Sequence, residues 1–160
     1  MGLLRENVSS STEWETPQGF FDRLDAEFDF GLDPCATHEN AKCPVYFTKA
    51  QDGLKMTWCG YGPVFVNPPY GREVGDWLQK SYEVSQHGIT VVALIPARTS
   101  TRWWHDYVMK AEEIRFVKGR LYFTINGKGG PAPFPSAVVV FNRDAKGSPR
   151  ISTMERSARP

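Results

Sequence analysis

The 160-residue sequence lacks a long hydrophobic run and carries little net charge. No apolar run approaches the roughly 20 residues that a membrane-spanning helix needs. The N-terminus also lacks the basic-then-apolar pattern of a secretion signal. These absences predict a soluble, intracellular protein with no membrane partner, and no protein partner is inferred. A net charge of +1 neither requires nor excludes nucleic acid, and 41% hydrophobic residues exclude a disordered chain.

Cysteine is scarce, at three residues. Cys35, Cys43 and Cys59 combine with His38 in the order Cys35-x2-His38-x4-Cys43-x15-Cys59, so a zinc site has to be considered. The spacing is irregular and no Cys-x2-Cys pair is present. We therefore expect no bound metal and three thiols that form no disulfide, as in a reducing compartment.

The length predicts one domain with a flexible start and end. Residues 1–12 show no hydrophobic periodicity and are predicted to be a flexible N-terminus. Residues 13–143 contain all the apolar segments and form the predicted domain. Residues 144–160 read as a basic, flexible tail, because five basic residues from Arg143 onward face only two acidic ones.

The apolar segments alternate between strand and helix patterns. Thr16-Pro17 is a good helix start, with Thr16 as the cap, and apolar residues follow at helical spacing up to Phe28. Further helices are predicted from Asp76 to about Gly88 and over 103–111. Strands are predicted at 30–33, 45–48, 63–66, 89–95, 113–116, 121–125 and 137–141, with a turn-dense loop at 127–135. The alternation predicts an α/β fold: a mostly parallel sheet with helices on both faces and ligands at the carboxyl ends of the strands.

The segment Asn67-Pro68-Pro69-Tyr70 directly follows the strand predicted at 63–66. Two prolines end the strand and fix an extended backbone before them, which presents the carbonyls rigidly. The Asn67 side-chain oxygen and the Pro68 carbonyl are therefore candidate acceptors for an –NH2 group, and Tyr70 offers a flat face for stacking. This pattern is typical of amino-group methyltransferases that use S-adenosylmethionine and act on adenine N6 or on a glutamine amide. An ordinary proline-rich turn is the alternative.

Three further segments are candidates for binding the cofactor. Asp33-Pro34-Cys35-Ala36 follows the first strand, where a carboxylate can pair with an α-amino group and small residues allow close approach. Thr16-Pro17 offers a hydroxyl and helix N–H groups to a carboxylate. Asp52, at a turn, could accept from an adenine amine. Each has a plain structural alternative as a turn or cap residue.

In these segments and their order, the chain resembles the phage-type DNA N6-adenine methyltransferases. The resemblance covers most of the length, and its specific part is the proline-pair segment. It implies a Rossmann-like class I S-adenosylmethionine-dependent methyltransferase fold in a minimal single domain. It further implies that Asn67 to Tyr70 hold the target adenine of DNA, that Asn67 also lies at the cofactor, and that Thr16, Asp33 and Asp52 contact S-adenosyl-L-methionine. The glycines usual in the cofactor loop are missing. A cytoplasmic location in a bacterial host, for a phage- or prophage-encoded protein, is implied in the same way.

The second half of the sequence is predicted to contact DNA through residues that follow a strand end and a turn. Two alternatives stay open at this point. The same tetrapeptide suits a protein glutamine-amide methyltransferase, and the Cys/His pattern suits a non-catalytic, zinc-containing nucleic-acid-binding module. The predicted DNA-contacting residues are Arg98, Thr99, Thr101, Arg102, Trp103 and Arg120.

Overall fold

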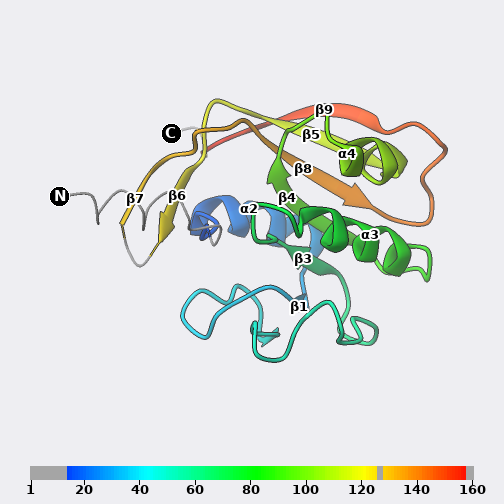
Figure 1. The fold of residues 1–160 in the computed structure, drawn as a ribbon, viewed down its shortest axis with the longest axis horizontal. Helices are drawn as coiled ribbons and strands as arrows, with labels where there is room; N and C mark the ends of the chain where they lie inside the picture. The colour runs from blue at the N-terminus through cyan, green and yellow to red at the C-terminus, as the bar shows by residue number, and fades with distance from the viewer. Residues whose placement is uncertain (1–13, 126–127, 158–160) are drawn as a thin grey trace.

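The computed structural model describes residues 14–125 and 128–157, and the predicted flexible N-terminus at 1–12 lies outside them. A seven-stranded sheet forms the centre of the molecule, in the order β2-β1-β3-β4-β8-β5-β9 (Figure 1). Its neighbours are parallel except where β8 pairs with β4 and β5. The mostly parallel α/β prediction is therefore confirmed. The strands of this sheet are β1 (Leu32–Asp33), β2 (Val45–Tyr46), β3 (Val64–Val66), β4 (Val91–Pro96), β5 (Glu113–Lys118), β8 (Ser136–Phe141) and β9 (Arg150–Glu155).

The central strands are the most deeply buried part of the sheet. Every residue of β3, β4 and β8 is buried, as expected for strands covered on both faces. β1, β3 and β4 run in the same direction, so their carboxyl ends meet at one edge of the sheet. Asp33 ends β1, Asn67 follows β3 and Ala97 follows β4, so the chemically interesting loops lie together.

Helix α2 (Gln18–Phe28) packs its apolar stripe against the sheet. Phe20, Phe21 and Leu24 are buried, and the Phe21 ring lies 5.1 Å from that of Phe65 in β3. The predicted cap is wrong in detail, because Pro17 occupies the N-cap position and no side chain caps the helix. The Thr16 hydroxyl instead accepts a hydrogen bond from Asn67.

The second long helix, α3 (Val74–Ser85), begins two residues before the predicted start and packs on β4. The helix predicted over 103–111 is wrong as a single element. It is divided into α4 (Arg102–Asp106) and a 3-10 turn (Val108–Lys110). No helix in the described part of the chain is both long and apolar enough to cross a membrane.

The C-terminal third departs most from the sequence prediction. The loop predicted at 127–135 contains β7 (Lys128–Pro131), which pairs with β6 (Tyr122–Ile125) in a separate two-stranded sheet. The predicted tail from residue 144 contains β9, which pairs with β5 at the edge of the main sheet. The sheet thus extends past the boundary at residue 143 that the sequence suggested.

Candidate functional site

A cavity of about 460 Å³ opens at the carboxyl edge of the sheet, where the loops after β1, β2 and β3 meet. This volume lies in the range of about 300–1,000 Å³ that small-molecule sites occupy. Acidic and basic side chains both reach it, as a zwitterionic ligand requires. Its lining residues are Trp14, Glu15, Thr16, Asp33, Pro34, Cys35, Ala36, Thr37, Asn40, Lys42, Thr48, Lys49, Asp52, Gly53, Leu54, Phe65, Asn67, Pro68, Pro69, Glu73 and Trp77.

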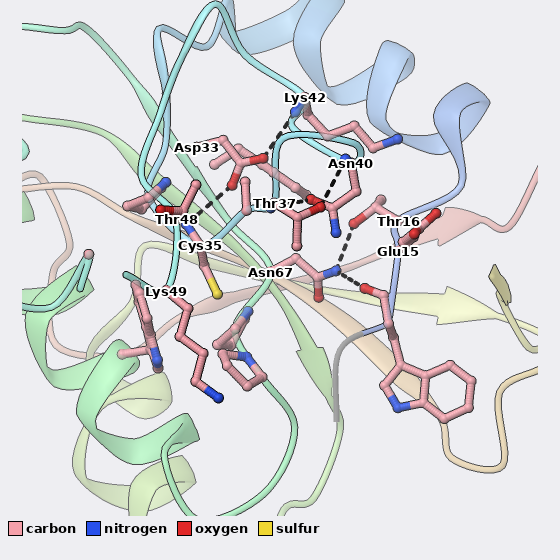
Figure 2. Close-up of a pocket in the computed structure, with 18 of the residues that line it drawn as sticks. Glu15, Thr16, Asp33, Cys35, Thr37, Asn40, Lys42, Thr48, Lys49 and Asn67 are labelled. Atoms are coloured by element: carbon pink, nitrogen blue, oxygen red, sulfur yellow. Dashed lines mark hydrogen bonds between the residues drawn. The ribbon is translucent and has the colours of Figure 1, made fainter. Parts of the chain in front are cut away.

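Asn67 lies in the middle of this cavity with its amide held in one orientation (Figure 2). Its Nδ2 donates to the Trp14 carbonyl at 2.6 Å and to Thr16 Oγ1 at 2.9 Å. A carbonyl can only accept, so the nitrogen must face Trp14 and the oxygen must point away from it. Asn67 Oδ1 is buried and has no hydrogen-bond partner among the described residues. An orphaned buried acceptor costs about 1–3 kcal/mol, which a ligand N–H would recover.

The residues after Asn67 separate into two groups. Pro68 and Pro69 line the cavity. Tyr70 does not line it, because its ring is buried against Phe123 and Phe134, with centroids 6.1 and 5.1 Å away. Its hydroxyl donates to the Leu94 carbonyl at 3.3 Å, and burial raises its pKa far above the usual range. Tyr70 therefore packs in the core behind the Asn67-Pro68-Pro69 turn and does not face the cavity.

Asp33 supplies a buried carboxylate at the end of β1, only 4% exposed. Its Oδ1 accepts from the Cys35 N–H at 3.4 Å and its Oδ2 from the Lys42 N–H at 3.0 Å. Burial raises its pKa from 3.8 to about 7, and the two backbone N–H groups and the Lys42 charge only partly oppose this rise. The site therefore holds a carboxylate that a cationic ligand group would stabilise in its charged form.

The loop that bears Asp52 is packed tightly against the Asp33 loop. Asp52 has a positive φ of 56°, and its carboxylate accepts from the Leu54 N–H at 3.3 Å. A Cβ at Gly53 would lie 2.0 Å from the Pro34 carbonyl oxygen, so only glycine allows this approach.

Helix α3 fixes the same loop from outside the cavity. The Lys80 ammonium donates to the carbonyls of Gly53, Leu54 and Met56, and the Trp58 indole N–H donates to the Gly53 carbonyl at 2.8 Å. The Trp58 ring stacks 6.1 Å from Trp77 of α3. Burial lowers the pKa of Lys80, although Asp52, Cys59 and Glu83 oppose the shift.

The structure brings most of the predicted site residues together. All the residues proposed for the cofactor line the cavity except Pro17, which sits at the start of α2. Sequence reasoning missed several lining residues, among them Lys42, Lys49 and Trp77. Lys42 and Lys49 lie in loops without a motif, and Trp77 reads as an ordinary core residue of its helix. No local signal marks them.

The predicted DNA-contacting residues lie outside the cavity, mainly after the carboxyl end of β4. Arg98, Thr99, Arg102 and Arg120 are exposed. Thr101 caps α4, with its Oγ1 accepting from the Trp104 N–H. The half-buried Trp103 has its ring centroid 6.2 Å from that of Trp104. Their contact with DNA stays a prediction.

The Cys/His pattern does not form a metal site. Within residues 14–125 and 128–157, no group of three or more His, Cys, Asp or Glu side chains is arranged to hold a metal ion. Cys43 is buried and Cys59 is exposed, and Cys35 lines the cavity. The structure therefore gives the zinc-containing alternative no support.

A ligand-sized cavity with an orphaned amide oxygen, at the carboxyl edge of a mostly parallel sheet, defines an α/β protein compatible with a methyltransferase fold. The family comparison agrees: the model of the family "DNA N-6-adenine-methyltransferase (Dam)" matches residues 5–159. The chain belongs to this family.

Two phage proteins are similar to this chain, and both are named DNA N-6-adenine-methyltransferase. The protein of Escherichia phage T1 is 30% identical over 115 residues, which cover 71% of this chain and 48% of that protein. The protein of Haemophilus phage HP1 (strain HP1c1) is 31% identical over 132 residues, which cover 80% of this chain and 76% of that protein. The chain thus spans about half the length of one relative and three quarters of the other.

Proposed function

We propose that this protein transfers a methyl group from S-adenosyl-L-methionine to the exocyclic N6 of adenine in DNA. The bound cofactor supplies an electrophilic methyl on a sulfonium. The family and the two phage relatives support the reaction class, and their phage origin supports the cytoplasm of a bacterial host as its place. The strand order, with the reversed β8 between β4 and β5, supports a Rossmann-like class I methyltransferase fold.

The observation that carries the proposal is the Asn67 amide. Its nitrogen is engaged by Trp14 and Thr16, and its oxygen is buried without a partner at a residue that lines the cavity. An adenine amine donates two N–H bonds, and Asn67 Oδ1 would accept one while the Pro68 carbonyl accepts the other. Because the amide is already oriented, no reorganisation is needed when the amine arrives.

The acceptors would also raise the reactivity of the amine. Hydrogen bonds to both N–H groups favour a pyramidal nitrogen and concentrate its lone pair, which the ring otherwise delocalises. Bound S-adenosylmethionine would supply the methyl and keep the C–S bonding pair on its sulfur, while the amine held by Asn67 and Pro68 would form the new N–C bond and lose one proton to solvent. Catalysis would therefore rest on orientation and electrostatics, with no strong general base.

The residues around the cavity fit the polar groups of the cofactor. The Asp33 carboxylate would pair with the α-amino group. Thr16 Oγ1 accepts from Asn67, which leaves its proton for a carboxylate oxygen. Lys42 and Lys49 line the same cavity and add positive charge for that carboxylate, and Asp52 and Gly53 form the wall proposed for the adenine.

An adenine in a duplex must leave the base stack to reach this cavity, at a cost of a few kcal/mol. The stacking role proposed for Tyr70 needs its face to become accessible, because Phe123 and Phe134 now contact the ring. The exposed residues Arg98, Arg102 and Arg120 would meet the phosphates of the bound strand.

The direct test is transfer of labelled methyl from S-adenosylmethionine to unmethylated DNA. Asn67→Ala should lower kcat by about 100-fold or more, as loss of one preorganised hydrogen-bonding group does in other enzymes. Binding of the product S-adenosylhomocysteine by calorimetry shows whether the variant is folded. Undiminished methyl transfer by Asn67→Ala would contradict the proposal that Asn67 accepts a hydrogen bond from the adenine amine.

A glutamine-containing peptide serves as the second substrate in the same assay. Methylation of the peptide with none of DNA would replace the proposed function by glutamine-amide methylation. One equivalent of zinc in the purified protein, with no cofactor uptake, would favour the non-catalytic module instead.

A further inference from the structure

The β6–β7 hairpin is the part of the molecule that the proposed chemistry leaves without a role. It forms a two-stranded sheet of its own, and in Figure 1 it stands beside the end of the main sheet. Here "hairpin" means the two strands Tyr122–Ile125 and Lys128–Pro131.

The hairpin is anchored to the residues that build the site, through Phe123 on its inner face and through Thr124. The buried Phe123 lies 6.1 Å from Tyr70, ring to ring, and 5.9 Å from Trp14. The Glu15 N–H donates to the Thr124 carbonyl at 2.9 Å, and the Thr124 hydroxyl donates to the Glu15 carboxylate at 3.2 Å. Because Glu15 lines the cavity, the hairpin is held rigidly at the wall of the site.

The outer face of the hairpin presents one large aromatic side chain. Successive strand residues point to opposite faces, so Tyr122 points away from the side on which Phe123 is buried. Tyr122 is 59% exposed, and its hydroxyl donates to the Gly129 carbonyl at 3.0 Å, which limits its rotation. On this face the partner strand carries only Pro131, directly opposite Tyr122, and Gly129, diagonal to it. A flat ligand group could lie on this face without a clash.

The stretch of sequence that contains the hairpin carries only basic charges, and the one acidic side chain described above as touching the hairpin is Glu15. Between Glu113 and Asp144 the sequence has five basic residues and no acidic one. Arg120 lies two residues before Tyr122, Lys128 begins β7 opposite Ile125 at the other end of the hairpin, and both are exposed. Positive charge beside an exposed aromatic ring is complementary to a nucleic acid, which offers phosphates and base faces together.

We propose that the outer face of the hairpin is a DNA-contact surface, on which Tyr122 stacks against a base next to the extruded adenine. The inference rests on the proposed function. When a base leaves the duplex, its neighbours lose a stacking partner, and an aromatic side chain held at the mouth of the site replaces part of that contact. Arg120 and Lys128 contact phosphates on either side, and the hairpin supplies DNA contacts from within the small domain.

The test compares binding of the full-length protein to a short adenine-containing duplex, measured by fluorescence anisotropy at fixed salt. Tyr122→Ala should weaken binding roughly 5- to 100-fold, the range for loss of one stacked aromatic side chain. Tyr122→Phe should bind as the wild type does, because it retains the ring. Ile151→Ala is the matched control, since Ile151 is 57% exposed on the distant strand β9. Lys128→Ala should reduce the slope of log affinity against log salt by about 0.9.

Binding of S-adenosylhomocysteine should be the same in all of these proteins, which separates the hairpin from the cofactor cavity. If the wild type methylates DNA and Tyr122→Ala does so with an unchanged KM and duplex affinity, the hairpin inference fails and the proposed function stands. An equal loss in Ile151→Ala would overturn it as well. A wild-type protein that neither binds nor methylates DNA would overturn both proposals.

Discussion

Two buried carboxylates, one at the carboxyl ends of the parallel strands and one at their amino ends, have opposite electrostatic environments. Asp33 ends β1 at the carboxyl edge and is 4% exposed, while Glu113 begins β5 at the amino edge and is 5% exposed. Burial raises the pKa of Asp33 to about 7. Burial also acts on Glu113, but hydrogen bonds from Arg115, Ser152 and Arg150, with the Arg115 charge, outweigh it and hold its pKa below the usual value.

The difference distinguishes a carboxylate that stabilises the fold, Glu113, from one that is available to bind a ligand, Asp33. Around Glu113, every partner needed for a buried ion is supplied by the chain: Arg115 bridges Glu113 at 2.7 Å and Glu27 at 2.6 Å, and Arg150 lies 3.2 Å from Glu113. At Asp33 the chain supplies two backbone N–H groups but no ammonium or guanidinium within salt-bridge distance in the part that the structure describes. A carboxylate that is buried without such a cation is a candidate to receive one from a ligand.

The largest effect is expected from a substitution that breaks the ion pairs around Glu113. Arg115→Met should lower the free energy of unfolding by about 3 kcal/mol, because it leaves Glu113 buried with fewer partners. Urea unfolding measures the loss. Arg150→Met is the control, and it should cost under about 1 kcal/mol because Arg150 is 65% exposed. Equal losses in the two variants would contradict the assigned difference.

Asp33→Asn should affect cofactor binding next most strongly. The charge-assisted hydrogen bond to the α-amino group would be lost, which weakens S-adenosylhomocysteine binding roughly 10- to 100-fold by calorimetry. In the wild type, affinity should increase as pH rises to about 7, because only the ionised Asp33 pairs with the cation. A pH-independent affinity would show that Asp33 does not receive the ligand.

The same group has the opposite effect on stability. Because the folded pKa of Asp33 lies above the unfolded value of 3.8, the folded state retains a proton that the unfolded state releases. The free energy of unfolding contributed by this group should therefore fall as pH rises from about 4 to 7 and then level off. Asp33→Asn should remove this decline and be more stable than the wild type by about 1–3 kcal/mol at pH 8, by thermal or urea unfolding.

Lys80→Met should have a smaller effect on the cofactor site. Loss of three hydrogen bonds to the carbonyls of Gly53, Leu54 and Met56 loosens the wall that Asp52 and Gly53 form. The affinity for S-adenosylhomocysteine should drop about twofold to tenfold, because ordering the loop then costs part of the binding energy. Lys55→Met, which removes only an exposed 3.8 Å ion pair with Asp52, should change the affinity less than Lys80→Met does.

Tyr70→Phe should have the smallest effect. It removes only the 3.3 Å hydrogen bond to the Leu94 carbonyl and keeps the ring against Phe123 and Phe134. Stability should decrease by about 0.5–1.5 kcal/mol, with kcat within about threefold of the wild type. A loss of methyl transfer comparable to that of Asn67→Ala would assign the hydroxyl a direct part in the reaction.

The sequence predicted those parts of the fold and the site that depend on local signals. Strands β3, β4 and β8 are apolar runs bounded by prolines or glycines, and α2 shows a clear stripe. Asn67 and Asp33 stand at strand ends, which parallel topology brings to one edge. The sequence could not predict β7, whose glycines and prolines are typical of a loop, and β9 has mostly polar residues that gain their order from pairing with β5.

Tertiary contacts determined the rest. The orientation of Asn67 depends on Trp14 and Thr16, more than 50 residues earlier, and the burial of Tyr70 depends on the hairpin. The three carbonyls that accept from Lys80 lie in a loop whose close approach to Pro34 requires glycine at position 53. Such contacts have no signature in the spacing of residues along the chain.

The hydrogen bonds from Asn67 to Trp14 and Thr16 have a practical consequence for how the protein is produced. A shortened version that starts at helix α2 would retain the sheet and both prolines yet release the amide to rotate. Such a truncated protein should give the circular dichroism spectrum of a folded protein but show no methyl-transfer activity. An affinity tag is therefore better fused to a position remote from Trp14, with this segment left intact.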